Sequence, residues 1–131
     1  PDFLGKHILL AEDNELNREI AEFALDQAGA HVTIAFDGRE AVDAFAAAAP
    51  GTFDLVLMDI MMPNMNGYEA TRAIRAMNRT DAKCVPIVAM SANAFADDVA
   101  YSRESGMNDH LAKPIDADKL VRVLARYRKD A

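Results

Sequence analysis

Three carboxylates follow apolar runs in this sequence, and they are the residues best suited to chemistry. Asp59 ends the run LVLMD, while Glu12 and Asp13 end the run HILLAED. In open sheets of parallel strands, ligands bind beyond the carboxyl ends of the strands, so polar residues there are functional candidates. A single aspartate at a strand end is as often a turn or helix cap. The functional interpretation of Asp59 therefore depends on its companions.

Two further apolar runs end in polar side chains of a different kind. PIVAMSA ends in Ser91, and DHLAKP contains Lys113 directly after its apolar residues. If the four runs are parallel strands, one edge of the sheet gathers three carboxylates, a hydroxyl and an ammonium group. Taken singly, Ser91 is equally well explained as a helix N-cap, and Lys113 as a solvated lysine.

The three carboxylates predict a divalent metal site, because clustered acids repel one another unless a cation neutralises them. Oxygen ligands alone favour Mg²⁺, for which Mn²⁺ can substitute. Zinc is not expected, since no paired ligand spacing occurs among the histidines and the single cysteine: His7, His31, His110 and Cys84.

A metal-bound aspartate beside a hydroxyl and a lysine is suited to phosphoryl transfer. Asp59 would act as the nucleophile and form an aspartyl phosphate. Lys113 would neutralise charge on the phosphoryl oxygens, and Ser91 would donate a hydrogen bond to another of them.

The elements that must position these residues alternate regularly along the chain. Apolar runs predict strands near 7–11, 32–36, 54–58, 86–91 and 109–112, and helical periodicity predicts helices near 14–28, 38–48, 65–77, 95–105 and 116–128. Runs without polar alternation are typical of strands covered on both faces. The 131 residues are long enough for one core, so a single domain over 1–131 is expected.

Local signals add expectations about packing and capping. The apolar stripe of the first helix is expected to face the core: Leu16, Ile20, Phe23 and Ala24. Asn64 is expected to cap the third helix, and Cys84 to pack at the start of the fourth strand. Met58 and Met65 are expected in the packing, while Met61 and Met62 are left open as loop residues near a partner's approach.

Composition narrows the class of protein. The net charge of −7 argues against direct binding to nucleic acid or to anionic membranes. No apolar run is long enough to span a membrane and no secretory pattern is present, so a cytoplasmic location is expected, including the cytoplasmic part of a membrane-bound sensor. The start at Pro1, without an initiator Met, indicates an excised fragment.

Four motifs in order resemble the receiver domain of two-component signalling: AEDN, LVLMDIMMPNMNGYEATRAIR, IVAMSANAF and MNDHLAKPI. The resemblance covers the whole chain, and the set is far more specific than any one motif. It implies an α/β, doubly wound (βα)5 flavodoxin-like sandwich. The five-stranded parallel sheet would have the order 2-1-3-4-5, with helices on both faces.

The resemblance also implies roles for individual residues. Asp59 would be the phosphoacceptor, Glu12 and Asp13 the metal-site acids, and the backbone carbonyl of Met61 a further metal ligand. Ser91 and Lys113 would contact the phosphoryl oxygens.

The resemblance implies three further expectations: a switch, a peptide-bond conformation and a control of phosphoryl lifetime. Ser91 would act as a switch together with His110, which stands where many receivers carry Tyr or Phe; a half-buried histidine at a strand end is an equally good interpretation. The Lys113–Pro114 bond is expected to be cis. Met61 and Asn93 are expected to modulate the lifetime of the phosphoryl group.

The implied function is a phosphorelay switch rather than a conventional enzyme. The domain would catalyse its own Mg²⁺-dependent phosphorylation and dephosphorylation, taking the phosphoryl group from a phosphohistidine on a histidine kinase or a histidine-phosphotransfer protein. Partner docking is expected around the first helix, and a phosphorylation-dependent dimer is a further expectation. The segments EATRAIR and MNDHLAKPID look most like receivers of hybrid sensor histidine kinases; the alternative is a free-standing response regulator.

Two alternatives come from other classes. A small-molecule phosphatase of the haloacid-dehalogenase type would also use a strand-end aspartate, but it needs a second Asp two residues later, where this chain has Met61. A receiver that serves only as an unphosphorylated interaction module would have lost site residues. All five are present: Glu12, Asp13, Asp59, Ser91 and Lys113.

Overall fold

Five parallel strands form the sheet at the centre of the computed structural model, which describes residues 5–91, 96–113 and 117–127. The strands are β1 (His7–Ala11), β2 (His31–Ala35), β3 (Leu55–Asp59), β4 (Ile87–Ser91) and β5 (Asp109–Ala112). Their order is β2-β1-β3-β4-β5, as predicted. The register pairs Asp59 with Met90 and Ser91 with Ala112, so the carboxyl ends of β3, β4 and β5 meet at one edge.

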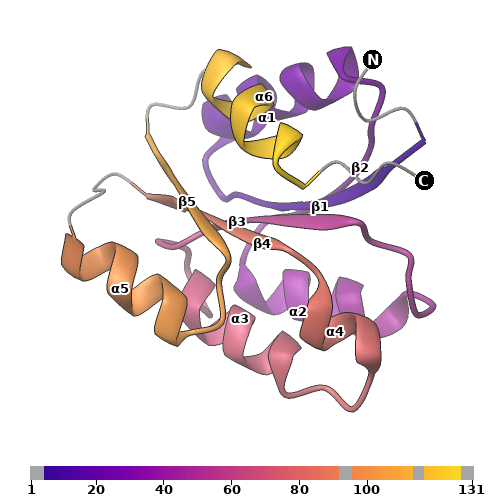
Figure 1. Cartoon of the computed structure of the whole chain (residues 1–131), viewed down its shortest axis with the longest axis vertical. Helices are drawn as coiled ribbons and strands as arrows, with labels where there is room; N and C mark the ends of the chain where they lie inside the picture. Colours follow the sequence, from indigo (N-terminus) through magenta and orange to yellow (C-terminus); the bar gives the residue numbers. More distant parts are fainter. Residues whose placement is uncertain (1–4, 92–95, 114–116, 128–131) are drawn as a thin grey trace.

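Helices cover both faces of the sheet (Figure 1). They are α1 (Glu15–Gln27), α2 (Gly38–Ala47), α3 (Gly67–Arg75), α4 (Thr80–Cys84), α5 (Ala96–Glu104) and α6 (Ala117–Ala125). Helices α1 and α6 lie on one face, and α2 to α5 lie on the other (Figure 1). Within the described ranges, no helix has both the length and the apolar character needed to cross a membrane.

Two hydrophobic cores lie on the two faces of the sheet. Ile8 and Leu10 of β1 pack under α1 and α6, whereas Leu9 and Ala11 pack with α2 and α3. Because successive strand side chains point to opposite faces, an uninterrupted apolar run feeds both cores at once. The interpretation of the runs as doubly covered strands is confirmed for β1, β3 and β4, whereas the edge strands β2 and β5 are only partly buried.

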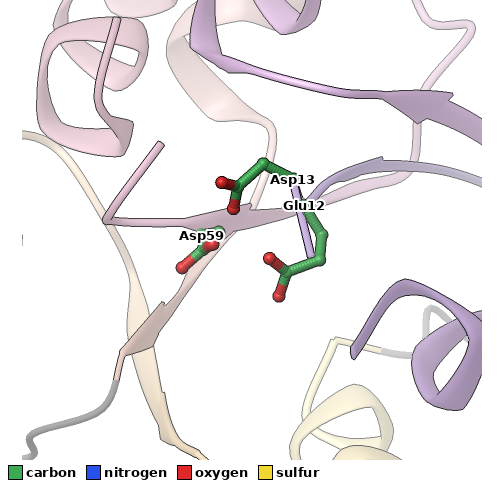
Figure 2. A group of neighbouring side chains, drawn as sticks. All are labelled: Glu12, Asp13 and Asp59. Atoms are coloured by element: carbon green, nitrogen blue, oxygen red, sulfur yellow. The ribbon is translucent and has the colours of Figure 1, made fainter. Parts of the chain in front are cut away.

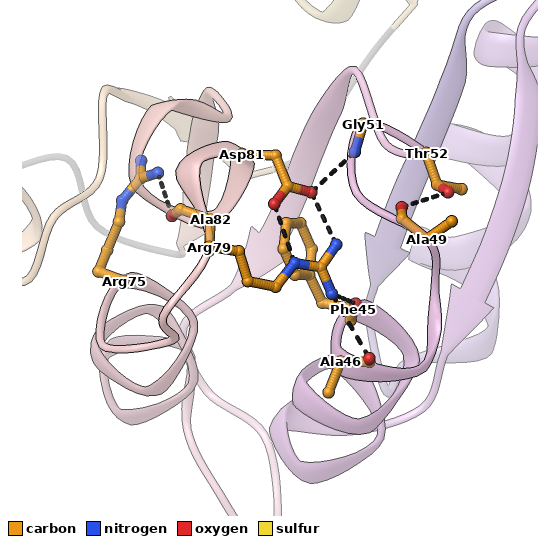
Figure 3. Close-up of polar contacts among 9 residues, drawn as sticks. All are labelled: Phe45, Ala46, Ala49, Gly51, Thr52, Arg75, Arg79, Asp81 and Ala82. Carbon is orange, nitrogen blue, oxygen red and sulfur yellow. Dashed lines mark hydrogen bonds and ion pairs between the residues drawn. The ribbon is translucent and has the colours of Figure 1, made fainter.

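Helix α4 was not predicted, and Arg79 ties it to the end of α2 (Figure 3). The Arg79 guanidinium donates two hydrogen bonds to Asp81, of 2.8 and 2.9 Å, and one to the Phe45 carbonyl oxygen of 3.0 Å. The central carbon atom of the Arg79 guanidinium also lies 5.0 Å from the centre of the Phe45 ring. A helix of only five residues is too short to show periodicity, so sequence patterns do not reveal it.

The expected inward face of α1 is confirmed for Ala24, which is buried, but it is wrong for Leu16 and Phe23, which are 65% and 64% exposed. Ile20 is half-buried, and the buried stripe is made of Ala21, Ala24 and Leu25. The helix carries two apolar stripes, and the one with small residues lets α1 pack closely on the sheet. Only the surface against which a helix packs decides between two such stripes.

Two smaller predictions are also wrong. The cap of α3 is Asn66, which forms a capping box with Glu69, whereas Asn64 takes a left-handed conformation with φ 66°. Cys84 is exposed at the end of α4 and does not pack under β4. The predictions for Asn93 and for the Lys113–Pro114 bond fall at least partly outside the described residues.

Candidate functional site

The predicted site residues gather at the carboxyl edge of the sheet. Glu12 and Asp13 follow β1, Asp59 is the last residue of β3, Ser91 is the last residue of β4, and Lys113 follows β5. Because β1, β3, β4 and β5 are parallel neighbours, these ends meet at one place.

The three carboxylates point toward one another (Figure 2). One oxygen from each of Glu12, Asp13 and Asp59 lies within 4.8 Å of the others. Asp13 is exposed, but Glu12 and Asp59 are 0% and 1% exposed. Two of the three acids are thus removed from water, which makes their mutual repulsion costly.

Within the described ranges, Lys113 is the cation that lies among the buried acids. Its Nζ atom lies 3.0 Å from Asp59 Oδ1 and 3.2 Å from Glu12 Oε1. Asp59 Oδ2 is buried and has no hydrogen-bond partner in the described part of the chain. One ammonium group therefore faces two buried carboxylates and a third at the rim, which leaves the site short of positive charge.

The pKa values follow from this imbalance. Burial, reinforced by the Glu12 carboxylate, raises the pKa of Asp59 to about 8, and Lys113 only partly offsets the rise. Burial by itself would lower the pKa of Lys113, but its carboxylate partners outweigh burial and raise it. Without another cation, the raised pKa of Asp59 opposes the ionised carboxylate that nucleophilic chemistry would need.

The residues fit a bound Mg²⁺. Ligand oxygens about 2.1 Å from an octahedral ion are separated by roughly 3 to 4 Å, close to the spacing of these carboxylates. The unpartnered Asp59 Oδ2 and the exposed Asp13 carboxylate leave ligand atoms available. The structure gives no contact that tests the Met61 carbonyl, so its role stays a prediction.

Arg18 is a residue beside the site that sequence reasoning missed. Its Nη1 atom donates to the carbonyl oxygens of Glu12 and Asp13, at 3.2 and 3.4 Å. Its guanidinium carbon lies 4.6 Å from the centre of the Phe36 ring. The sequence places Arg18 on a polar face of α1, one turn after the acid pair, and that position is the only signal that could have indicated it.

The loop between β3 and α3 is fixed by close backbone packing. A Cβ atom on Gly67 would lie 2.3 Å from the Asp59 carbonyl oxygen, and Gly67 N–H donates to the Ile60 carbonyl at 2.9 Å. Asn64 donates a 2.6 Å hydrogen bond to Asp37, the N-cap of α2. Between these anchors the Met61 side chain is 75% exposed.

Ser91 and His110 are joined directly. Ser91 Oγ lies 2.7 Å from His110 Nε2, and Ser102 Oγ lies 3.4 Å from His110 Nδ1. The ring is half-buried between β5 and α5. The histidine therefore contacts the hydroxyl group expected to bind a phosphoryl oxygen.

Comparisons with known proteins agree with this geometry. Residues 8–125 match the family described as the response regulator receiver domain. The two-component response regulator ORR41 of Oryza sativa subsp. japonica is 44% identical over 124 residues, covering 92% of this chain and 93% of the relative.

Two solved structures are similar along nearly the whole chain. The receiver domain of a sensor histidine kinase from Pseudomonas aeruginosa, solved with magnesium in its active-site cleft, has a TM-score of 0.83 and 41% identity, covering 94% of this chain and 97% of that chain. A co-crystal structure of the Saccharomyces cerevisiae phosphotransfer protein Ypd1 with the receiver domain of Ssk1 gives 0.84 and 27%, covering 96% and 90%.

Other relatives are much longer than this chain. They include histidine kinases of Dictyostelium discoideum, Oryza sativa and Arabidopsis thaliana, at 36 to 38% identity. The chain spans only 7 to 13% of the length of these relatives.

Proposed function

This chain belongs to the response regulator receiver family of two-component phosphorelays, and from that premise we propose that Asp59 is its phosphoacceptor. The observation that carries the proposal is the buried Asp59 carboxylate, which pairs with Lys113 through Oδ1 and has no partner at Oδ2 among the described residues. A carboxylate that a lysine holds through one oxygen, while its other oxygen has no hydrogen-bond partner, is suited to nucleophilic attack.

The transfer reaction follows from the positions of the side chains. One oxygen of the Asp59 carboxylate forms a bond to phosphorus while the bond from phosphorus to the donor's imidazole nitrogen breaks, and that nitrogen keeps the electron pair. Lys113, already 3.0 Å from Oδ1, pairs with a phosphoryl oxygen, and Ser91 donates a hydrogen bond to another. Bound Mg²⁺, for which Mn²⁺ can substitute, would be held by Asp13, Asp59, Glu12 and the Met61 carbonyl and would supply the missing positive charge.

The Ser91–His110 hydrogen bond supports a switch role for both residues. Movement of the Ser91 hydroxyl group toward a phosphoryl oxygen would lengthen or break its 2.7 Å contact with His110 Nε2. The expected readout is a change in the His110 ring resonances when the Asp59 site is phosphorylated. Unchanged resonances would contradict the switch.

Exposed apolar side chains support docking of a phosphohistidine protein on α1. Leu16, Ile20 and Phe23 follow helical spacing; Leu16 and Phe23 are exposed and Ile20 is half-buried. Unburied apolar surface of this kind marks interaction sites. The Ypd1 complex of a similar receiver domain is a precedent for such a partner.

The origin of the chain in a hybrid sensor kinase is a finer part of the proposal, supported by the long histidine kinases among its relatives. The domain over 1–131 would then work in the cytoplasm, receive its phosphoryl group from a kinase of the same polypeptide and pass it to a phosphotransfer protein. Comparing rates of transfer from a linked kinase and from a free phosphotransfer protein tests this origin.

The primary experiment is intact-protein mass after incubation with acetyl phosphate and magnesium. The parent should gain one phosphoryl group, whereas Asp59→Asn and a sample without magnesium should gain none. Asp26→Asn removes an exposed carboxylate at the far end of α1 and serves as the matched control. No phosphoryl group on the folded parent, from acetyl phosphate or from a phosphohistidine protein, would overturn the proposal.

A small-molecule phosphatase is not supported. The residue two positions after Asp59 is Met61, which has no acidic group to protonate a leaving alcohol. Family membership agrees with a signalling domain rather than a conventional enzyme.

A further inference from the structure

Arg18 joins two turns that border the carboxylate site. It donates to the carbonyl oxygens of Glu12 and Asp13, the two residues that supply acids from the turn after β1. Its guanidinium also lies over Phe36, which follows β2. One side chain therefore links the backbone that carries two of the acids to the neighbouring turn.

The Phe36 end of this link is itself anchored. Phe36 N–H donates to Glu40 Oε1 at 3.1 Å, in the first turn of α2. Glu12 N–H donates to the Ala35 carbonyl at 3.1 Å, beside Phe36. Phe36 is 50% exposed, and the Arg18 guanidinium lies over one face of its ring.

The turn after β1 needs such support because it is exposed and its acids repel. Residues 13 to 16 are all exposed, so side-chain packing adds little to the hydrogen bonds that Asn14 makes with Glu12, Asn17 and Arg18. Repulsion among Glu12, Asp13 and Asp59 tends to open the turn. Arg18 Nη1 reaches both carbonyl oxygens while the planar guanidinium stacks on the Phe36 ring, and a lysine ammonium cannot stack in this way.

We propose that Arg18 is a positioning residue for the metal site, holding the Glu12–Asp13 turn in the arrangement that binds Mg²⁺. The inference rests on the proposed function for its role in phosphotransfer. Its effect on magnesium affinity can be measured without phosphorylation. Arg18 touches neither the carboxylate oxygens nor the reacting atoms, so it acts through the backbone.

The direction in which Arg18→Met changes the affinity for Mg²⁺ distinguishes a positioning role from a simple effect of charge. Arg18→Met removes a positive charge beside three acids, which on Coulombic grounds alone would strengthen Mg²⁺ binding. Loss of positioning would weaken it instead, by about tenfold, as is common when partners that orient ligands are removed. Phe36→Leu leaves the charge unchanged and should weaken binding in the same direction, by less.

The test is the Mg²⁺ dissociation constant from titration calorimetry on the whole chain. Arg18→Met should bind about tenfold more weakly, and Arg18→Lys should recover only part of the loss. Arg39→Met is the matched control, because Arg39 is an exposed arginine that pairs with Asp43 on α2 and its loss changes net charge equally. Its affinity should stay within about twofold of the parent, as for surface changes away from a site.

A second readout distinguishes positioning from general damage. Melting without magnesium should show Arg18→Met folded, and its rate of phosphorylation by acetyl phosphate should approach that of the parent at saturating Mg²⁺. Equal or tighter Mg²⁺ binding by Arg18→Met would overturn the inference even if the parent is phosphorylated. A parent that binds Mg²⁺ but accepts no phosphoryl group would overturn the proposed function and leave the Arg18 result interpretable. No Mg²⁺ binding by the parent would overturn the inference.

Discussion

At the scale of single residues, the burial of Asp59 opposes the ionised state that its proposed chemistry requires. Asp59 must lose its proton to act as a nucleophile, yet burial and Glu12 raise its pKa to about 8 in the metal-free site. A cation that binds together with the phosphoryl donor would lower this pKa, so that Asp59 could be both buried and ionised. Lys113 offers one positive charge to Glu12 and Asp59, so the proposed phosphotransfer would need a further cation such as Mg²⁺.

The first prediction concerns the stability of the metal-free protein against pH. The folded-state pKa of Asp59 lies above the unfolded value near 3.8, so its contribution to stability is present below pH 4 and is lost as pH rises toward 8. Asp59→Asn should therefore raise the free energy of unfolding at pH 8 by about 1–3 kcal/mol. Urea unfolding in EDTA at several pH values checks this.

The difference in unfolding free energy between Asp59→Asn and the parent should shrink toward pH 4, where the parent carboxyl group is protonated in both the folded and the unfolded state. Saturating magnesium should reduce it as well, because the ion then offsets the charge. A difference between variant and parent that stays constant from pH 4 to 8 would contradict the raised pKa.

At the scale of elements, the site depends on how closely α3 begins against the end of β3. Gly67 is the first residue of α3, and its missing side chain allows contact with the Asp59 carbonyl. The nearest atoms are backbone, which cannot rotate away. The second prediction is that Gly67→Ala lowers the free energy of unfolding by about 2–3 kcal/mol, because the methyl group has no room.

Chemical denaturation measures the cost of Gly67→Ala, and phosphorylation by acetyl phosphate should slow because Asp59 is displaced. Asn66→Ala removes the neighbouring cap and should cost about 1 kcal/mol, which separates the loss of helix capping from the clash. A Gly67→Ala variant with parental stability would contradict the close approach.

The third prediction concerns the contacts of Arg79 that hold α4 against the end of α2 (Figure 3). Hydrogen bonds from Arg79 hold the pKa of Asp81 at about 2, so stability from this carboxylate is present above pH 4 and is lost as pH falls through about 2. Arg79→Met should lower the melting temperature by about 5 °C at pH 7. Thermal melting followed by circular dichroism measures this.

The difference in melting temperature between Arg79→Met and the parent should narrow below pH 3 as Asp81 becomes protonated. Arg79→Lys should rescue little of the loss, because an ammonium group cannot pair with both carboxylate oxygens and also reach Phe45. Full rescue by lysine would indicate that charge alone matters.

At the scale of the whole molecule, one face of α1 packs in the core and the other is exposed, and we propose that the exposed face binds the phosphohistidine protein. Leu25 is fully buried, whereas Leu16 and Phe23 are mostly exposed on the same helix. The fourth prediction is that replacing Leu16 and Phe23 together by Ser slows phosphotransfer from a phosphohistidine protein at least tenfold, with stability changed by about 0.5 kcal/mol or less.

Phosphorylation of this double variant by acetyl phosphate should match that of the parent, because a small donor needs no docking surface. Leu25→Ala provides the contrast, with an expected loss of about 2–5 kcal/mol in unfolding free energy. Equal transfer from the protein donor to parent and double variant would exclude this face as the docking surface.

The fifth prediction links the metal to global stability. An ion that binds the folded acids and not the unfolded chain stabilises by mass action, so millimolar Mg²⁺ should raise the melting temperature of the parent. Asp13→Asn should weaken this response, while removal of one repelling charge makes the metal-free variant at least as stable as the parent. An identical Mg²⁺ response in both would exclude Asp13 as a ligand.

The sequence by itself determined the sheet and the residues at its edge. Uninterrupted apolar runs identify strands that are covered on both faces, and parallel strands must bring their carboxyl ends together. Glu12, Asp59, Ser91 and Lys113 therefore lie where their spacing predicts. Such information is local, because each run carries its own polar residue at its end.

Only the tertiary structure decided which side chains pack and which reach the site from elsewhere. Helix α1 has two apolar stripes, and the sheet selected Ala21, Ala24 and Leu25 rather than the stripe with Leu16 and Phe23. Arg18 and Phe36 are far apart in sequence and meet only because β1 pairs with β2. Periodicity records which residues share a face, but the choice of buried face and long-range contacts depends on the surfaces that folding brings together.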